Sequence, residues 1–507
     1  MAKLLSQCGE AVSIEENIKL GTLRRMPEGG NKSMKRSDGV VRLIQQWIEN
    51  GTLAPGSKAP SVRQMSRITG YSMSTVHSAY GVLESSGVIV AQPRSGFYID
   101  KSAAPVVQTT STQDHTAFEA AHEISISDLS MKLFASWSNS EIQQFGAIYP
   151  SPDLFPVDEI NLHFRRILRR SSSWGFARSS NLAQGDLSLR TAIARRYVEH
   201  GMTVNAADIL LTAGGMQGVN LTLNVLTKPG DIVLIESPAM FPVFTALEHR
   251  GLRAIELPQT PGRGLDPDQF RYLVERHDVR ACVMMANHHY PTGATSPEGV
   301  LRQIVQTAKK HNIPIIENAG YMDLHYGSQS PASFKKFDDC GLVYQIGSFS
   351  NMLAPGYGAG WLIPGRLSEK IVQMKFTSAL LSGGIFQRAV ADYINCGSFD
   401  RHLRSLRAKL RSRMAEGLKL IDEHFPSECV VNPPEGGFMC WIEGPPEFNA
   451  MAASREALSL GIGMPAGPLF SVREALTNCI GLNFSFAWDK KSEERLKTIG
   501  ELIKKHS

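Results

Sequence analysis

The chain has 507 residues, of which 42% are hydrophobic and 20% are charged, and this composition is typical of soluble globular proteins. The length exceeds that of one ordinary compact domain, so we expect several. No apolar run approaches the ~20 residues of a membrane span and the N-terminus lacks a secretion signal, so we expect a cytoplasmic protein without a membrane partner. The seven cysteines have no CxxC spacing, which favours reduced thiols over a metal site. The net charge of +5 does not identify a partner.

The N-terminal hundred residues divide into an arm and a compact block. Residues 1–36 are polar and lack periodicity, which predicts a disordered arm. Residues 37–101 form the block, in which we predict three helices. The predicted ranges are Val40–Asn50, Val62–Ile68 with Ser61 as its N-cap, and Ser74–Ser85.

The second and third helices are joined by Thr69-Gly70-Tyr71-Ser72, a short turn with a glycine, as a helix-turn-helix requires. Two strand-like segments, Val88–Ala91 and Gly96–Ile99, flank a turn that carries Arg94, which predicts a β wing. In such a unit the start of the third helix enters the DNA major groove. We therefore predict DNA contacts from Arg63, Ser72, Ser74, Thr75, His77 and Arg94.

This block resembles the winged helix of the GntR family. The matching residues are Gly51-x-Leu53-x-Pro55-Gly56, Pro60-Ser61-x-Arg63, Thr75-Val76-x-x-Ala79-Tyr80-x-x-Leu83-Glu84-x-x-Gly87 and Ser95-Gly96. The resemblance implies binding to double-stranded DNA, and eight basic against four acidic residues between positions 35 and 101 favour phosphate contact. The alternative is a small helical interaction module that binds no nucleic acid. Under either interpretation Val76, Tyr80 and Leu83 belong to the core.

The rest of the chain predicts a linker and a second, larger domain. Residues 102–140 are rich in Ser, Thr, Ala and Gln, which is typical of a linker. From 141 to 507, buried strand-like runs alternate with helical patterns, which predicts a mostly parallel sheet covered by helices. The strand candidates are Ile209–Thr212, Ile232–Ile235, Ala281–Met285 and Pro314–Glu317.

Residues 141–507 resemble the effector domain of MocR-type regulators, in which a GntR winged helix precedes a fold-type I aminotransferase-like domain. The matching segments are Ser151-Pro152-Asp153-Leu154-Phe155-Pro156, Gly185 to Arg196, Thr212 to Gln217, Tyr290-Pro291-Thr292-Gly293, Gln387 to Arg407 and Gly436 to Trp441. The expected fold is therefore multidomain, with a winged helix-turn-helix (α+β) followed by an α/β fold-type I domain. The resemblance also implies a homodimer that presents two DNA readers.

Domains of this type hold pyridoxal 5′-phosphate (PLP), and the resemblance assigns part of a site for it. The backbone of Gly214, Gly215 and Met216 at a helix start and the hydroxyls of Ser348 and Ser350 are expected to form the phosphate cup. Tyr321 stands where the family places a tyrosine facing the ring hydroxyl. Tyr290 is also expected to line this pocket.

The positions that carry the chemistry have changed. Asn351 stands where the family has the lysine that forms the Schiff base, and an asparagine has no nucleophilic amine. Asn318 replaces the aspartate that holds the pyridine nitrogen, and it cannot offset a pyridinium charge. Gly358 and Gly481 replace two expected arginines, and Met240 replaces the stacking aromatic, for which the adjacent Phe241 is a substitute.

These changes favour a DNA-binding transcriptional regulator that is not an enzyme. Its aminotransferase-like domain would dimerise the chain and sense an unidentified small molecule, with PLP bound at most weakly and non-covalently. Two alternatives stay open: a PLP-dependent aminotransferase-like enzyme, and a regulator that binds PLP through Tyr321, Ser348 and the glycine backbone. His288 and His289 are adjacent and point to opposite faces of a strand, so we expect packed histidines and no metal site.

Overall fold

The computed structural model describes residues 36–49, 53–54, 56–85, 88–92, 96–100, 121–122, 124, 139, 141–170, 183–260, 264–379 and 383–507. The chain forms two compact units, residues 1–113 and 114–507, so the division falls within the segment expected to be a linker. Arg94 at the predicted wing tip lies outside the described residues. Within the described part of the chain, no helix is long and apolar enough to cross a membrane.

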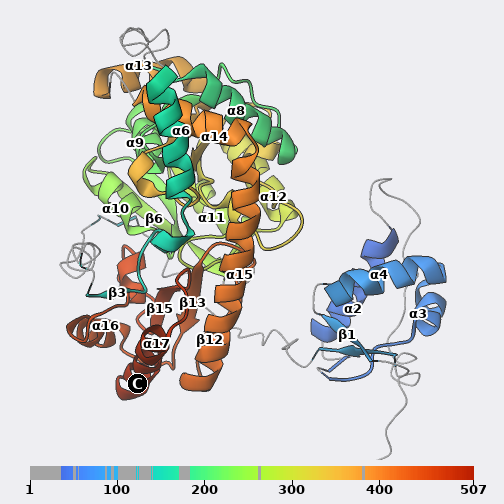
Figure 1. Cartoon of the computed structure of the whole chain (residues 1–507). Helices are drawn as coiled ribbons and strands as arrows, with labels where there is room; N and C mark the ends of the chain where they lie inside the picture. The colour runs from blue at the N-terminus through green and yellow to red at the C-terminus, as the bar shows by residue number, and fades with distance from the viewer. Residues whose placement is uncertain are drawn as a thin grey trace, which may run out of the picture. The chain divides into compact units, whose positions relative to one another are not determined.

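The described residues of the smaller unit form three helices and a two-stranded antiparallel sheet (Figure 1). The bounds are α2 (Arg36–Glu49), α3 (Val62–Thr69), α4 (Met73–Ser85), β1 (Ile89–Gln92) and β2 (Gly96–Ile99). The first helix begins four residues earlier than predicted, because the hydrophobic pattern marks only the turns that reach the core. Val40 and Ile44 of α2 pack there with Val76, Tyr80 and Leu83 of α4, and all five are fully buried.

The larger unit is built on an eight-stranded sheet with the order β4-β11-β10-β9-β8-β5-β6-β7. The bounds are β4 (Leu210–Thr212), β5 (Ile232–Ser237), β6 (Arg253–Thr260), β7 (Gly264–Leu265), β8 (Val279–Met284), β9 (Ile315–Asn318), β10 (Val343–Ser348) and β11 (Gly360–Ile363). The strands from β10 to β6 pair in parallel, and β11 and β7 are antiparallel to their neighbours. The predicted α/β class is confirmed.

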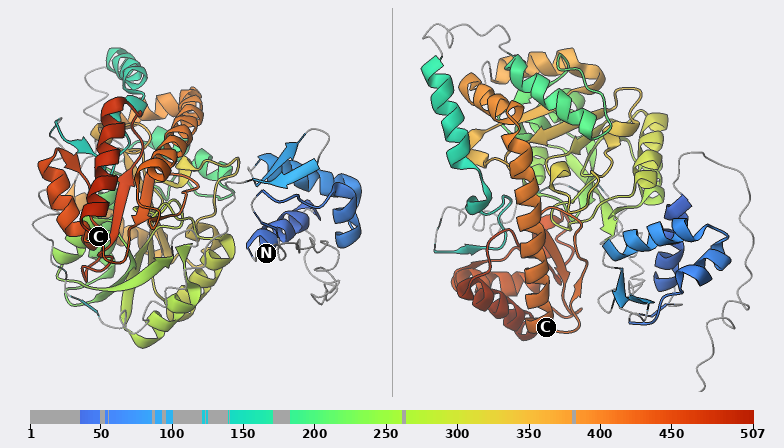
Figure 2. Two further views of the ribbon diagram at one scale, coloured as in Figure 1. Left: turned by 90° about the horizontal axis from the view of Figure 1, so that it is seen from below. Right: turned by 45° about the vertical axis from the view of Figure 1, so that its right-hand side comes forward.

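Helices cover this sheet, and a smaller layer follows it in the chain (Figures 1 and 2). The helices are α6 (Val157–Arg170), α8 (Leu187–Glu199), α9 (Gly215–Leu226), α10 (Phe241–Glu248), α11 (Pro267–Arg276), α12 (Glu298–His311), α13 (Ser368–Ser378), α14 (Gly384–Asn395), α15 (Ser398–His424), α16 (Ala450–Ser459) and α17 (Lys490–Lys505). The smaller layer is the antiparallel sheet β12 (Val430–Val431), β13 (Met439–Glu443) and β15 (Cys479–Asn483). Helix α15 runs from the main sheet to this layer (Figure 1).

Short elements complete the larger unit. They are β3 (Gln143–Gln144), which pairs with β14 (Ile462–Gly463), and the 3₁₀ turns η2 (Pro152–Leu154), η3 (Met322–Leu324), η4 (Phe334–Phe337), η5 (Pro355–Tyr357), η6 (Gly365–Leu367) and η7 (Gly467–Phe470). Upstream of them, His122 forms two backbone hydrogen bonds with Ala254 of β6. Part of the expected linker is therefore bonded to the main sheet.

The sheet register determines which side chains meet at the carboxyl edge. Strands β9 and β10 are parallel neighbours, and Ile346 is the partner of Asn318. Asn318, which ends β9, and Ser348, which ends β10, are therefore at the same edge of the sheet. Ligands of open α/β sheets bind at this edge.

Candidate functional site

The helix-turn-helix of the smaller unit is fixed by its caps. Ser61 and Gln64 form a capping box at the start of α3, with the Gln64 N–H donating to Ser61 Oγ at 3.3 Å and the Ser61 N–H to Gln64 Oε1 at 2.9 Å. Gly70 ends α3 at φ 72°, a conformation that favours glycine. Ser72 then caps α4, because its Oγ accepts from the Thr75 N–H at 3.2 Å.

The predicted DNA-contacting residues gather around this turn. Arg63, Ser72, Ser74 and His77 are exposed, whereas Thr75 is half-buried. The Ser72 hydroxyl lies 2.9 Å from that of Ser74 and 2.8 Å from that of Thr75, so these three hydroxyls are already bonded to one another.

On the opposite side of α4, the Tyr80 hydroxyl donates to the carbonyl of Pro60 at 2.6 Å and ties α4 to the start of α3. Burial raises the pKa of Tyr80, which keeps the phenol protonated. One face of α4 is thereby anchored while its polar N-terminal turn stays open.

In the larger unit, the residues predicted for the phosphate cup come together at the start of α9. Gly214 has φ 118°, and the position of a Cβ on Gly360 would lie 2.7 Å from its carbonyl carbon, so both positions require glycine. A Cβ on Gly215 would lie 3.8 Å from Ser348 Cβ, which places the helix start against the end of β10. The Ser348 hydroxyl donates to Ser350 Oγ at 2.9 Å.

The remaining cup positions lie beside these residues. Gly358 follows η5 at φ 52°, and a Cβ there would lie 3.8 Å from the carbonyl oxygen of Ala213, next to the loop that begins α9. Met216 is half-buried and packs with the apolar cluster under the sheet. The cup thus consists of backbone groups and two hydroxyls, and a phosphate fits groups of this kind.

Asn318 and Asn351 meet at the backbone of Gly320. The Gly320 N–H donates to Asn318 Oδ1 at 3.2 Å, and Asn351 Nδ2 donates to the Gly320 carbonyl at 3.4 Å. Asn318 Nδ2 contacts Met240 Sδ at 3.6 Å. Asn351 is only 6% exposed, and its Oδ1 has no hydrogen-bond partner among the described residues. Both amides are therefore engaged with the backbone of the same residue.

Tyrosines line the same region, and their hydroxyls bond to the chain. The Tyr321 hydroxyl donates to the carbonyl of Ile148 at 3.2 Å, and that of Tyr290 lies 3.5 Å from the carbonyl of Gly146. Burial raises the pKa of Tyr321 well above its usual value, although Asn351 lowers it, so the phenol stays protonated. The Tyr321 ring packs 5.3 Å from the ring of Phe438.

Close packing surrounds the other pocket positions, Met240, Phe241 and Gly481. Met240 and Phe241 stand at the start of α10 and pack between the two apolar clusters of the main sheet. Gly481 pairs with Trp441 across β15 and β13. A Cβ on Gly481 would lie 3.2 Å from Pro291 Cβ and 3.3 Å from the Trp441 ring, so the space next to this position is filled.

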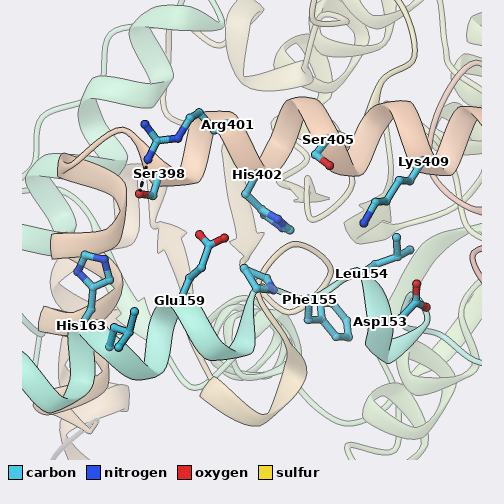
Figure 3. Close-up of a pocket in the computed structure, with 12 residues that line it drawn as sticks. Asp153, Leu154, Phe155, Glu159, His163, Ser398, Arg401, His402, Ser405 and Lys409 are labelled. Atoms are coloured by element: carbon cyan, nitrogen blue, oxygen red, sulfur yellow. Dashed lines mark hydrogen bonds between the residues drawn. The ribbon is translucent and has the colours of Figure 1, made fainter.

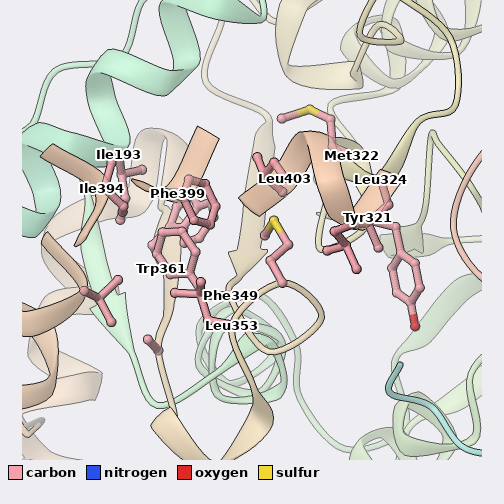
Figure 4. Packing of buried hydrophobic residues seen from close by; sticks show 14 of the residues in the cluster. Ile193, Tyr321, Met322, Leu324, Phe349, Leu353, Trp361, Ile394, Phe399 and Leu403 are labelled. Carbon is pink, nitrogen blue, oxygen red and sulfur yellow. The ribbon is translucent and has the colours of Figure 1, made fainter. Parts of the chain in front are cut away.

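The segment that carries Asn351 is held by an apolar cluster and by one histidine. Phe349 and Leu353 are buried beside Trp361, Phe399 and Leu403 (Figure 4). His402 of α15 lies with Nε2 2.6 Å from the carbonyl oxygen of Met352. The sequence motif around His402 was visible, but its contact with residue 352 depends on a turn of the fold that periodicity does not predict.

Sequence reasoning also missed two buried ionic groups. Arg196 Nη2 lies 2.9 Å from Asp323 Oδ1, and Arg407 Nη2 lies 3.5 Å from the same oxygen. Burial would raise the pKa of Asp323, but these arginines hold it well below its usual range. His289 Nε2 lies 3.1 Å from Glu236 Oε2, while His288 faces Thr295. The two adjacent histidines thus make separate contacts.

Comparisons with known proteins agree with this two-unit arrangement. Residues 36–99 match the family of bacterial regulatory proteins of the gntR family, and residues 172–484 match aminotransferase class I and II. The chain is 30% identical to the uncharacterized HTH-type transcriptional regulator YjiR of Escherichia coli, over 93% of this chain and 99% of that protein. It is 29% identical to the uncharacterized HTH-type transcriptional regulator YdcR of Escherichia coli over the same shares.

Solved structures of aminotransferases share the fold of the larger unit. The multiple substrate aminotransferase from Thermococcus profundus superimposes with a TM-score of 0.68 at 23% identity, over 75% of this chain and 95% of that chain. The match of both family models in this order, together with the full-length relatives, shows that the chain belongs to the MocR-type transcriptional regulators, which join a GntR winged helix to an aminotransferase-like domain.

Proposed function

We propose that this regulator binds operator DNA through α3 and α4 and that its aminotransferase-like domain performs no Schiff-base chemistry. The observation that carries the proposal is the amide pair: Asn318 and Asn351 both bond to the backbone of Gly320. A carboxamide is neither a nucleophilic amine nor a counter-charge for a pyridinium. The residues present do not fit a covalently held PLP.

In this proposal the larger unit dimerises the chain and responds to a small molecule. A dimer places two winged helices on one operator, and a ligand alters DNA affinity only if it binds two dimer arrangements unequally. Size-exclusion chromatography with light scattering tests the dimer. A monomer at the concentration that binds DNA would contradict it.

The DNA interface is tested with Arg63→Ala. Because Arg63 is exposed at the first turn of α3 and phosphate contacts release counterions, we expect weaker binding to duplex DNA from the upstream region of its own gene. The slope of log K against log salt should fall by about one. Lys497→Ala on the exposed face of α17 is the matched control. An unchanged slope in Arg63→Ala would place the interface elsewhere.

A second candidate is a regulator that holds PLP non-covalently, and the retained cup favours it. Gly214 and Gly215 at the start of α9 lie beside Ser348 and Ser350, so backbone N–H groups and two hydroxyls are close together. The loss of charged partners costs ~1.5–3 kcal/mol each, so affinity should be weaker by orders of magnitude than in an enzyme. Equilibrium dialysis separates the candidates, since a dissociation constant of millimolar or weaker would reject the second one.

A further inference from the structure

A cavity of about 530 Å³ lies in the larger unit between α15 and the segment formed by η2 and α6 (Figure 3). Arg401, His402 and Lys409 line it from α15, and Asp153 and Glu159 line it from the other wall. This volume is in the range of small-molecule sites. The cofactor-like pocket, which consists of Gly214, Gly215, Asn318, Tyr321, Ser348 and Asn351, uses none of these residues.

The α15 wall is rigid, because the opposite face of this helix is part of the apolar core. The residues of that face are Phe399, Leu403, Leu406 and Leu410, each at most 3% exposed. Side chains on the cavity face are therefore presented from a fixed backbone. Rigid elements of this kind hold binding groups in place better than loops do.

The charges in the cavity are only partly matched. Asp153 is paired with Arg413 at 2.5 Å, and Glu159 Oε2 accepts from the Tyr393 hydroxyl at 3.0 Å, whereas Glu159 Oε1 has no hydrogen bond from any residue that the structure describes. Within the described ranges, Lys409 has neither a hydrogen bond nor a carboxylate at ion-pair distance. Arg401 donates to Ser398 Oγ at 2.9 Å and likewise has no carboxylate among the described side chains.

His402 stands between these charges (Figure 3). Its Nε2 donates to the carbonyl of Met352, so in the neutral ring Nδ1 is an acceptor. Burial lowers the pKa of His402 and outweighs the bond to Met352 and the charge of Glu159, which raise it, so the neutral form is favoured; Lys409 adds a smaller lowering effect. A ligand that contacts His402 would be linked to Met352, the residue after Asn351, through the hydrogen bond of His402 to the Met352 carbonyl.

We propose that this cavity binds an acidic amino acid. The α-carboxylate is held by Lys409, the ammonium by Glu159, and the side-chain carboxylate by Arg401. Once Arg413 has neutralised Asp153, the two free cations and one carboxylate leave an excess of one positive charge, which a ligand of charge −1 cancels. A dianion without an amine would leave Glu159 unpaired, and a diamine would be repelled by Lys409 and Arg401. The site does not require the cofactor-like pocket.

The test is isothermal titration calorimetry of the full chain with L-glutamate, L-glutamine, 2-hydroxyglutarate and putrescine. We expect L-glutamate to bind more tightly than the other three, because each of them lacks one charge or has the wrong sign. Lys409→Met and Glu159→Gln should each weaken L-glutamate binding at least about tenfold, as expected for a lost charge-assisted contact. Arg401→Met should reduce L-glutamate to the affinity of L-glutamine.

Three controls keep the result specific. Lys419→Met changes an exposed lysine of the same helix, Asp158→Asn an exposed carboxylate of α6, and Tyr321→Phe the cofactor-like pocket. All three should bind L-glutamate as the wild type does. Binding that survives Lys409→Met and Glu159→Gln but is lost in Tyr321→Phe would place the ligand in the cofactor-like pocket and overturn the proposal. No heat of binding with any probe at millimolar concentration would also overturn it.

Discussion

The two ends of the cofactor-like pocket are built from different parts of the chain. The cup end consists mainly of backbone, with Gly214 and Gly215 at the start of α9 and Gly358 beside them. The ring end consists of side chains, and there Asn318 and Asn351 bond to the backbone of Gly320 while Asn318 Nδ2 contacts Met240 Sδ. The cup end thus offers groups that suit a phosphate, whereas Asn318 and Asn351 at the ring end offer amides, which are neither an amine nor a carboxylate.

Packing constrains the glycines next to the cup more than those of the cup itself. A Cβ on Gly218 would lie 3.0 Å from Ile346 Cγ2, and one on Gly360 would lie 2.7 Å from the carbonyl carbon of Gly214. A Cβ on Gly215 would meet nothing closer than 3.7 Å, and one on Gly358 nothing closer than 3.8 Å. The contact of α9 with the sheet therefore accounts for Gly218 and Gly360 but not for Gly215, whose place in the cup stays compatible with a bound phosphate.

Placing an arginine at position 481, where the resemblance to PLP enzymes predicts one, should have the largest effect. In Gly481→Arg the new side chain would meet Pro291 and the Trp441 ring at 3.2 and 3.3 Å from its Cβ, and it would bury an unpaired charge. We expect a loss of at least about 3 kcal/mol in the free energy of unfolding, measured by urea denaturation. Gly299→Ala, where a Cβ meets nothing within 4 Å, is the control. A fully stable Gly481→Arg would show that the arginine space is still open.

A second prediction concerns Lys375, a lysine of α13 that is fully buried and donates to the carbonyl of Ala183. Burial lowers its pKa to about 8 from 10.5. The unfolded chain therefore binds more protons between these values, and the stability of the wild type should rise with pH across that window. Lys375→Met should be more stable than the wild type at pH 7 by about 2 kcal/mol, and the difference should shrink toward pH 10.5. A difference that does not vary with pH would mean that the amine is not desolvated.

The smallest expected effect is the difference in stability between Gly218→Ala, next to the cup, and Gly215→Ala, within it. Gly218→Ala should lose about 1 kcal/mol, because the contact with Ile346 outweighs the better helix propensity of alanine. In Gly215→Ala the nearest atom would be 3.7 Å away, so its free energy of unfolding should stay within about 0.5 kcal/mol. Urea denaturation of the two variants measures both. Equal losses would show that the contact with Ile346 does not distinguish position 218 from position 215.

Much of this arrangement follows from local sequence. The periodicity of Val40, Ile44 and Ile48 and the cap at Ser61 predicted the winged-helix core, and apolar runs predicted the central strands within a few residues. The interpretation of Asn351 as the position of the Schiff-base lysine stays a prediction, and the structure places this residue beside Asn318 at the backbone of Gly320. Contacts between distant segments were not predictable. The bond from His402 to Met352 depends on where α15 lies against the main sheet, and the packing of Trp441 against Gly481 depends on the pairing of β13 with β15 in the smaller sheet.

The central claim is that the pocket has no amine for PLP, and an absorbance titration of the purified chain with PLP tests it most directly. The account predicts that the wild type shows only the spectrum of free PLP, and that after borohydride reduction and gel filtration the protein retains no covalently bound pyridoxyl group. Asn351→Lys supplies the missing amine and is measured in parallel. A saturable red-shifted band in the wild type at one equivalent would show that another lysine serves the site, and would contradict the account.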